Sequence, residues 1–395
     1  MNTSTTARPT TTRPTTTGPL TVDAAGPADV RAAILTSRAL GLPLTVQATG
    51  HGTVVPPDEG LLLKTSRMSG VLVDPSRRIA RAGAGARWSE VIAAAAPLGL
   101  APLSGSHASV GVTGYTLGGG VGPLSRRYGF AADHLLRARI VTADGRRLTA
   151  DADHHPDLFW ALRGGGGGNF GVVTSLEFRL HPVSSVYAGV ALFPVERAAD
   201  VLTRFRDESD ARPDELSVSV ALANHDVHGR VVAVRAVYAG SAADGARALR
   251  SLLEAGGPPV HDGFRTMPYA ETESLGGTAP HHFHLYADLP DALIAAITAC
   301  DASGIELRQW GGAMARPAPD AGPVGHRDVP FSLTIDGPDD ALAPYATGGS
   351  FLNFLHDPSR TATAYTPGDL RRLREVKRAY DPQNVFHRNH NIRPA

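Results

Sequence analysis

The segment Asp157–Phe178 reads DLFWALRGGGGGNFGVVTSLEF and runs from an apolar helical turn through five consecutive glycines into a β-branched strand. A loop without side chains lets main-chain N–H groups approach a pyrophosphate or a flat heterocycle closely. A flexible linker is the alternative interpretation, but linkers rarely sit between Phe159-Trp160 and Val172-Val173. We therefore interpret Gly164–Gly168 as the cradle of a ligand, closed by Asn169 and Phe170.

Two earlier segments repeat this glycine-rich pattern. Gln47–Thr53 (QATGHGT) follows the strand-like run Leu42–Val46, and Gly105–Gly122 (GSHASVGVTGYTLGGGVG) forms a second loop. Each alone is a weak signal, but together they indicate one extended ligand contacted by several backbone loops. None has the spacing of a P-loop or of a Rossmann dinucleotide fingerprint, so neither site is predicted.

With these glycine-rich loops, the chain resembles the berberine bridge enzyme-like flavoproteins of the vanillyl alcohol oxidase superfamily, which share a PCMH-type FAD-binding domain. QATGHGT is similar to the family's first flavin loop, and Ser109–Gly129 (SVGVTGYTLGGGVGPLSRRYG) to its second. Val73–Val91 resembles the family's hairpin and helix, and Tyr380–Ile392 (YDPQNVFHRNHNI) its closing motif. The resemblance is strong over residues 20–183 and 347–392 and weaker between them.

The resemblance implies FAD, attached covalently through His51. A second attachment through cysteine is not expected, because His107 stands at that position and the only cysteine, Cys300, is read as a small core residue. The alternative for His51 is a plain turn histidine. The implied FAD-contacting residues are Ala48, Thr49, Gly50, His51, Gly52, Thr53, Gly105, Ser106, His107, Val110, Gly111, Gly114, Gly118, Gly168, Asn169, Gly171, Val172, Val173, Asn389 and Asn391.

Catalysis is where the chain departs from the family. Many bacterial members carry a tyrosine in a YxN segment, but here the segment is Phe351-Leu352-Asn353, and phenylalanine cannot accept a proton. A histidine could replace the tyrosine, because its imidazole titrates near neutral pH. The predicted base or substrate-wall residues are His282, His284, Gln309 and His326, with Tyr286, Trp310 and Arg327 as further members of the wall.

Clustered histidines also raise the possibility of a metal site. His281–His284 and His225–His228 are rich in potential ligands, but neither has a helical i, i+4 pair or a cysteine partner. Strand alternation would put His282 and His284 on one face, which we expect to line a pocket over the flavin. No metal is predicted.

The fold is expected to be α+β, with a two-part FAD-binding domain and an inserted antiparallel sheet covered by helices. Residues 1–18 are predicted to be a disordered Thr/Pro-rich tail, 19–183 the FAD-binding domain, 184–345 the substrate domain and 346–395 a segment returning to the FAD-binding domain. Predicted helices include Pro27–Leu40, Trp88–Leu98, Pro156–Leu162, Pro290–Ser303 and Pro367–Tyr380. Asp144-Gly145 is expected to supply two positive φ angles in a tight hairpin turn.

Composition narrows the class of protein. The formal net charge is zero, which gives no reason to expect nucleic acid or an anionic membrane as partner. No 18-residue apolar run is present, and the single cysteine fits a reducing, cytoplasmic compartment. Thirty-six of the 38 basic residues are arginine, which with abundant alanine and glycine favours a GC-rich bacterial origin.

The expected function is oxidation of a small molecule, with hydride transfer to flavin N5 and reoxidation by O2. Val110 stands where oxidases of the family place a small residue, which favours an oxidase. A flavin-containing cyclase or rearrangement enzyme without net oxidation is the alternative, and a noncatalytic flavin-binding protein is a third. The substrate is not identified, although a short second domain points to a natural-product intermediate, and no pattern indicates an oligomeric state.

Overall fold

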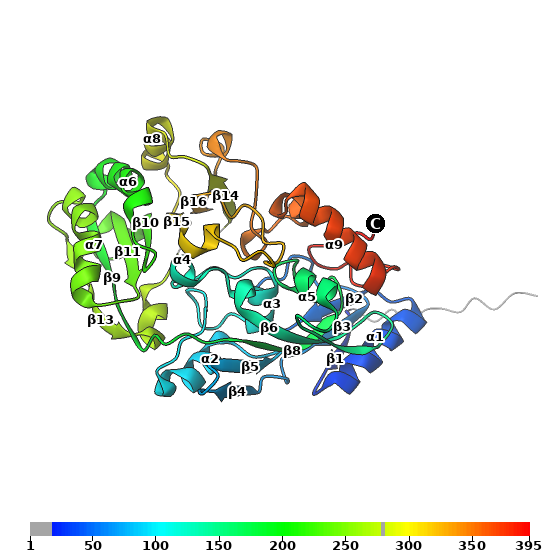
Figure 1. The fold of residues 1–395 in the computed structure, drawn as a ribbon. Helices are drawn as coiled ribbons and strands as arrows, with labels where there is room; N and C mark the ends of the chain where they lie inside the picture. Colours follow the sequence, from blue (N-terminus) through cyan, green and yellow to red (C-terminus); the bar gives the residue numbers. More distant parts are fainter. Residues whose placement is uncertain (1–17, 278–280) are drawn as a thin grey trace, which may run out of the picture.

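The computed structural model describes residues 18–277 and 281–395, so the predicted disorder of residues 1–17 falls outside the described part. Within it the chain forms an α+β fold of two parts, with mixed helices and three sheets. The larger sheet and its helices occupy one side of the molecule, and the two smaller sheets the other (Figure 1).

A parallel three-stranded sheet begins the fold, in the order β1-β3-β2. It packs on α1 (Pro27–Leu40), which starts with proline at its first position and ends at Gly41, whose φ of 62° is the left-handed conformation that terminates helices. Val30, Ala33 and Ile34 form the buried stripe of this helix. The strands are β1 (Leu20–Asp23), β2 (Leu44–Gln47) and β3 (Leu61–Lys64).

An antiparallel five-stranded sheet follows, in the order β4-β5-β8-β6-β7. Its central strand β8 is a nearly continuous run of buried residues, because helices and loops cover both of its faces. The strands are β4 (Val71–Asp74), β5 (Ile79–Gly83), β6 (Leu135–Val141), β7 (Arg147–Ala150) and β8 (Val172–Arg179). The helices of this part are α2 (Trp88–Ala95), α3 (Val112–Leu117), α4 (Ser125–Tyr128), α5 (Pro156–Leu162) and α9 (Pro367–Tyr380).

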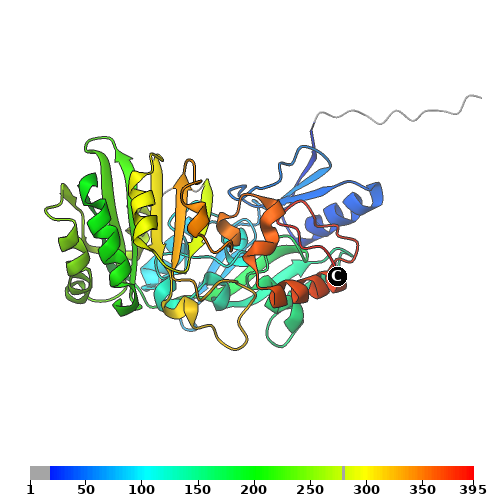
Figure 2. The same ribbon diagram turned by 90° about the horizontal axis from the view of Figure 1, so that it is seen from above.

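The third sheet has eight antiparallel strands, in the order β12-β9-β11-β10-β15-β16-β14, with β13 also paired to β9. Three helices, α6 (Ala198–Asp207), α7 (Ala242–Ala255) and α8 (Asp291–Ala299), cover its outer face (Figures 1 and 2). The strands are β9 (Ser185–Pro194), β10 (Leu216–His225), β11 (Gly229–Tyr238), β12 (His261–Asp262), β13 (Arg265–Pro268), β14 (His282–Tyr286), β15 (Gly304–Gln309) and β16 (Phe331–Asp336).

Short 3-10 turns connect these elements and carry the chain back after β16. Leu352, Tyr365, Leu373 and Ile392 join the same hydrophobic core as Trp88 and Leu176, so the C-terminal segment packs on the five-stranded part. The turns are η1 (Ala96–Leu98), η2 (Ala131–His134), η3 (Val195–Arg197), η4 (Ser209–Ala211), η5 (Tyr269–Leu275), η6 (Gly312–Ala315), η7 (Ala343–Tyr345), η8 (Leu352–Phe354) and η9 (Pro358–Ala364).

Two local predictions were wrong. In the β6–β7 hairpin only Gly145 has a positive φ, of 80°, because the turn closes through Gly145 N–H bonded to Thr142 O, and Asp144 instead uses its carboxylate to accept from the Thr142 hydroxyl. The helix predicted to reach Ser303 ends at Ala299, since Cys300 already has an extended backbone. Cys300 packs, partly buried, against the helix-covered core.

Candidate active site

The five-glycine loop is tied to the C-terminal segment by asparagine side chains. Asn389 Nδ2 donates to Gly168 O at 2.8 Å, and Asn169 Nδ2 donates to His390 O at 3.0 Å. In return the Ile392 N–H donates to Asn169 Oδ1 at 2.9 Å. Segments more than 200 residues apart therefore form one unit, which contains Gly168, Asn169 and Asn389.

A buried lysine anchors this unit. Lys377 Nζ, on α9, donates to Asn169 O at 2.7 Å, to Phe386 O at 2.9 Å and to Asp381 Oδ2 at 2.6 Å. The Lys377 and Asp381 side chains are both 0% exposed, and burial lowers the pKa of Lys377. All three donors of the ammonium are used, which is the condition for keeping a charge inside a protein.

The His51 loop presents its histidine outward. Gly50 has a φ of 80°, and the Thr53 hydroxyl closes the turn by donating to Gly50 O at 3.0 Å. His51 is exposed, so its ring is accessible for covalent attachment. A Cβ on Gly111 would lie 3.0 Å from the Thr49 side chain, which places the first and second glycine-rich loops side by side.

The second loop is clamped by Asn353, the asparagine of the Phe351-Leu352-Asn353 segment. Asn353 Oδ1 accepts from Gly120 N–H at 2.8 Å, and Nδ2 donates to Tyr115 O at 3.2 Å. A Cβ on Gly118 would lie 2.6 Å from Asn353 Nδ2, so this glycine makes room for the clamp. A Cβ on Gly114, by contrast, would meet nothing within 4 Å, and its face of α3 is open to a ligand.

Unpartnered polar atoms test whether these loops fit FAD. Four buried side-chain atoms beside these loops have no hydrogen-bond partner in the described part of the chain. They are the Oδ1 atoms of Asn389 and Asn391 and the hydroxyls of Thr113 and Thr116 on α3. Buried polar groups are normally paired, so unpaired groups lining glycine-rich loops favour a polar ligand there. These residues fit a dinucleotide with a heterocyclic head such as FAD.

Three of the predicted FAD-contacting residues have a structural role. A Cβ on Gly171 would lie 2.5 Å from Val141 O, so Gly171 allows β8 to approach β6. Val172 and Val173 belong to two hydrophobic cores on opposite faces of β8, and their side chains are not available to a ligand. The predicted residues Ser106, His107 and Val110 lie on the loop before α3, where His107 is exposed.

A cavity of about 100 Å³ lies between the second loop and the eight-stranded sheet. Ser106, Val121 and Gly122 line it from the loop side, and Ser219, Arg235, Glu306 and Arg308 from strands β10, β11 and β15. Ligand sites usually measure about 300–1,000 Å³, so this cavity is sized for one end of a substrate.

Glu306 is the centre of the polar wall of this cavity. Its Oε1 accepts from the Ser219 hydroxyl at 2.8 Å, and its Oε2 accepts from Arg308 Nη2 at 2.9 Å. Arg235 Nη1 lies 3.5 Å from Glu306 Oε1. Ser219 pairs with Arg308 on one neighbouring strand and with Arg235 on the other, so strand register brings the four side chains together.

The predicted catalytic histidines of β14 lie on the other face of the sheet. His284 pairs with Leu333 and Tyr286 with Phe331, both residues of the helix-covered core, and His284 Nε2 bonds to Asp339 Oδ2 at 2.7 Å. His282 Nδ1 lies 3.6 Å from the same carboxylate. The prediction that these histidines face the flavin is corrected: alternation was right, but Phe283 and Leu285 occupy the inner face.

The other predicted wall residues are engaged in structural contacts. Gln309 borders the cavity, but its Oε1 accepts from Arg212 Nη1 at 3.0 Å and its Nε2 donates to Ser209 O at 2.5 Å. His326 Nε2 bonds to Thr363 O at 2.7 Å. Arg327 pairs with both carboxylate oxygens of Asp133, at 2.6 and 3.0 Å.

Phe351 stands in an aromatic cluster beside the second loop. Its ring centroid is 5.4 Å from that of Trp310 and 5.6 Å from that of Phe130, and a Cβ on Gly119 would lie 2.8 Å from its edge. The side chain is 3% exposed. Phe351 therefore shapes the loop and offers no proton acceptor.

Glu306, Arg308, Arg235 and Ser219 were not among the predicted site residues. One signal was available, because Glu306 and Arg308 alternate with Ile305 and Leu307 within one strand. Such alternation indicates a polar face on this strand. It does not indicate that Arg235, on a strand far away in the sequence, lies next to that face.

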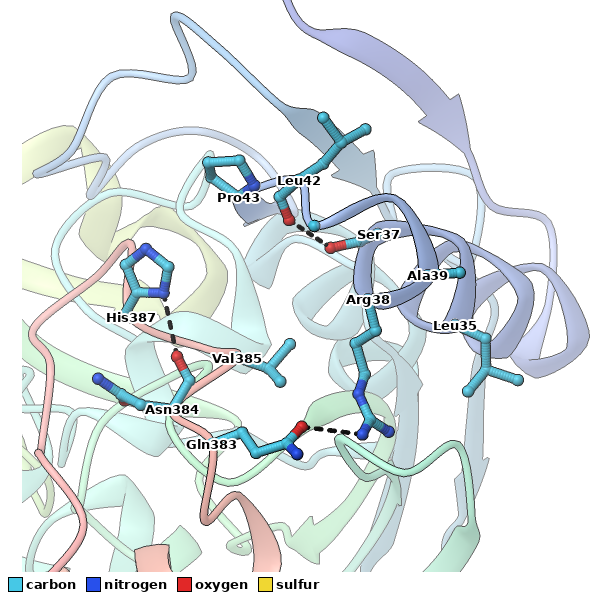
Figure 3. Close-up of a pocket in the computed structure, with 11 residues that line it drawn as sticks. Leu35, Ser37, Arg38, Ala39, Leu42, Pro43, Gln383, Asn384, Val385 and His387 are labelled. Carbon is cyan, nitrogen blue, oxygen red and sulfur yellow. Dashed lines mark hydrogen bonds between the residues drawn. The ribbon is translucent and has the colours of Figure 1, made fainter.

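A second depression lies at the surface, between the end of α1 and residues Gln383–His387 (Figure 3). Arg38 Nη2 donates to Gln383 Oε1 at 2.9 Å, and the Ser37 hydroxyl donates to Leu42 O at 2.8 Å. His387 Nδ1 bonds to Asn384 O at 3.0 Å. Asn384 Oδ1 is buried here without a hydrogen-bond partner among the described residues, but Glu306 and its arginines have no counterpart in this depression, where Arg38 is the one lining arginine among those residues.

No group of three or more His, Cys, Asp or Glu side chains within residues 18–277 and 281–395 is arranged to hold a metal ion. Over the same residues, no helix has both the length and the apolar character needed to cross a membrane.

Comparison with known proteins identifies the class. A family model described as FAD binding domain matches residues 19–151, and one described as berberine and berberine like matches residues 350–393. An uncharacterized FAD-linked oxidoreductase, YgaK of Bacillus subtilis, is 30% identical over 85% of this chain and 82% of the relative. The (R)-6-hydroxynicotine oxidase of Paenarthrobacter nicotinovorans is also 30% identical, over 90% of this chain and 86% of the relative.

A solved structure agrees with these matches. The crystal structure of 6-hydroxy-D-nicotine oxidase from Arthrobacter nicotinovorans has a TM-score of 0.84 and 27% identity, covering 96% of this chain and 93% of that one. The chain is thus an FAD-linked oxidoreductase. It belongs to the berberine bridge enzyme-like family of the vanillyl alcohol oxidase superfamily.

Proposed function

We propose that this enzyme is an oxidase of a small molecule, such as a natural-product intermediate, and that its FAD is attached covalently through His51 alone. The observation that carries the proposal is the cavity, which has a flavin-loop side formed by Ser106 and Gly122 and a polar wall formed by Glu306 and the two arginines. When bound, FAD supplies the hydride acceptor and is reoxidised by O2.

Glu306 is proposed to take the proton that leaves the substrate heteroatom, replacing the predicted histidines in this role. It is the only carboxylate among the described residues that line the cavity. The guanidinium groups of Arg308 and Arg235 lie 2.9 and 3.5 Å from its two carboxylate oxygens and hold the carboxylate in place. The phenols behind the cavity cannot serve, because burial raises the pKa of Tyr269 to about 12 and that of Tyr115 well above its ordinary value.

The strand and loop elements position the substrate. A rigid sheet face opposite the second loop fixes the distance between polar wall and flavin loop, which lowers the entropic cost of reaching the reactive geometry. Asn389, Asn391 and the α3 threonines are proposed to hold the flavin. The cytoplasmic location expected from the single cysteine remains part of the proposal.

Acid precipitation tests the attachment. Yellow colour should stay in the precipitate of the wild type and move to the supernatant in His51→Ala, whereas His107→Ala should behave as the wild type. Colour in the supernatant of the wild type contradicts covalent attachment, and a colourless protein refolded with FAD contradicts flavin binding.

One observation favours a second candidate function, a cyclisation or rearrangement without net oxidation. Phe351 replaces the tyrosine of many bacterial relatives and is fully engaged in the aromatic cluster. Anaerobic mixing with a converted substrate separates the two: bleaching of the flavin supports the oxidase, and product formation at unchanged colour supports the alternative.

A further inference from the structure

We infer that the cavity binds the carboxylate of an anionic substrate, held between Arg235 and Arg308. This inference rests on the proposed function, because it names the class of molecule that the same site would accept.

The cavity has an excess of positive charge. Among its described lining residues the charged side chains are Arg126, Arg235, Arg308 and Glu306. Arg126 is occupied by backbone carbonyls, with Nε donating to Leu216 O at 2.7 Å and Nη2 to Arg212 O at 3.2 Å. Of the described lining residues, Glu306 is the one carboxylate beside Arg235 and Arg308, so one positive charge of this trio is not neutralised within it.

Arg235 offers a donor without an acceptor. Its Nε is fixed by Leu275 O at 2.9 Å, whereas Nη1 is buried and has no hydrogen-bond partner among the described residues. The 3.5 Å separation from Glu306 Oε1 gives electrostatic attraction without a hydrogen bond. A buried guanidinium donor in this condition costs free energy unless an acceptor binds, and an anionic oxygen is the strongest acceptor available.

Arg308 is held ready beside it. Arg308 Nη2 donates to Glu306 Oε2, and the Arg308 guanidinium lies 5.3 Å from the centre of the Phe354 ring. These contacts fix the plane of the guanidinium, so little rotamer freedom is lost when a ligand binds. Ser219 on β10 pairs with Arg235 on β11 and with Arg308 on β15, and this register places one arginine on each side of the Glu306 carboxylate.

The arginines lie close to the flavin loop. A Cβ built on Gly277 would lie 3.6 Å from both Arg308 Nη2 and Glu306 Oε2, and 3.9 Å from Ser106 Cβ. A carboxylate seated here therefore lies beside the loop that carries Ser106. The remainder of the molecule extends out of the cavity, whose volume of about 100 Å³ suits one small anionic group.

Calorimetric titration of the FAD-loaded protein with benzoate, and with benzamide as a neutral match, tests the inference. Benzoate should bind and benzamide should not. Arg308→Gln and Arg235→Gln should each weaken benzoate binding about tenfold or more, the effect of losing one charge-assisted hydrogen bond. Arg308→Lys, which keeps the charge, should lose less, and Arg316→Gln, which removes a surface arginine paired with Asp214, should lose nothing.

Glu306→Gln should change the benzoate affinity in the opposite direction. Removing the only carboxylate of the trio should tighten benzoate binding, even though the proposed function expects this variant to reduce its flavin slowly. Equal binding of benzoate and benzamide, no binding of benzoate at millimolar concentration, or wild-type affinity in both glutamine variants overturns the inference. Calorimetry measures binding without turnover, so it is independent of oxidase activity. If the wild-type enzyme bound benzoate in preference to benzamide but oxidised no substrate, the proposed function would be overturned and this inference would stand.

Discussion

The side-chain amide of Asn353 bridges the second glycine-rich loop, accepting a hydrogen bond from the Gly120 N–H at 2.8 Å and donating one to Tyr115 O at 3.2 Å. The C-terminal segment thereby sets the conformation of a loop more than 200 residues earlier in the chain. In the segment that resembles the family's YxN motif, Asn353 stands at the asparagine position and Phe351 at the tyrosine position.

Asn353→Ala should destabilise the fold by ~1–3 kcal/mol, because the Gly120 N–H and the Tyr115 carbonyl lose their partner. In the His51→Ala background, where the flavin is not covalently linked, FAD should also bind more weakly, since the loop is no longer held. Urea unfolding and flavin titration measure the two effects. Asn224→Ala, at an exposed position of β10, is the control, and equal effects of the two substitutions would contradict the role of the clamp.

Lys377→Met should cost about 3–5 kcal/mol, because it leaves Asp381 buried without its counter-charge. The double variant Lys377→Met/Asp381→Asn should be more stable than Lys377→Met alone, since no unpaired charge remains. A double-mutant cycle by chemical unfolding checks this. Lys64→Met, at the only other lysine, controls for loss of positive charge, and additive effects would show that the pair is not coupled.

Acid should destabilise the protein partly through His181. Burial lowers the pKa of His181 from 6.5 to about 3, while its ring lies 3.9 Å from that of Tyr128. Between these two pH values His181 is protonated in the unfolded chain but neutral in the folded protein. The free energy of unfolding therefore decreases as the pH is lowered through this window, by at most about 1.4 kcal/mol per pH unit.

His181→Phe removes this titration, and its unfolding free energy should depend less on pH than that of the wild type. Urea unfolding at pH about 7 and about 5 measures the difference. His261→Gln, at an exposed strand residue, should retain the wild-type slope. Parallel pH profiles for wild type and His181→Phe would mean that the buried imidazole does not sense acid.

Gly122→Ala should destabilise the loop at the cavity by about 1–3 kcal/mol or more, since overpacking forces the backbone to move. The added Cβ would lie 1.9 Å from Ser104 O, a backbone atom that cannot swing aside. Gly70→Ala is the matched control, because nothing lies within 4 Å of its Cβ position. Thermal unfolding of both variants decides the matter, and a harmless Gly122→Ala would show that the loop is pliable.

Local sequence patterns determined much of the fold. Pro27–Leu40, Pro156–Leu162 and Pro367–Tyr380 form helices with the predicted bounds, because proline at the start and an apolar stripe of helical period act within one turn of chain. The glycine-rich loops were likewise predictable, since only glycine permits their backbone approaches.

Only the tertiary structure decided which face of a strand meets the flavin loops. Alternation correctly put His282 and His284 on one face, but both faces of β14 carry buried residues, and hydrophobicity cannot tell which one meets the helix-covered core and which one meets the aromatic cluster around Phe351. The grouping of Arg235, Glu306 and Arg308 also depended on strand order, because register between β11, β10 and β15 is a property of the whole sheet. The sequence by itself thus determined the loops that could hold FAD, and long-range strand pairing selected the side chains that face them.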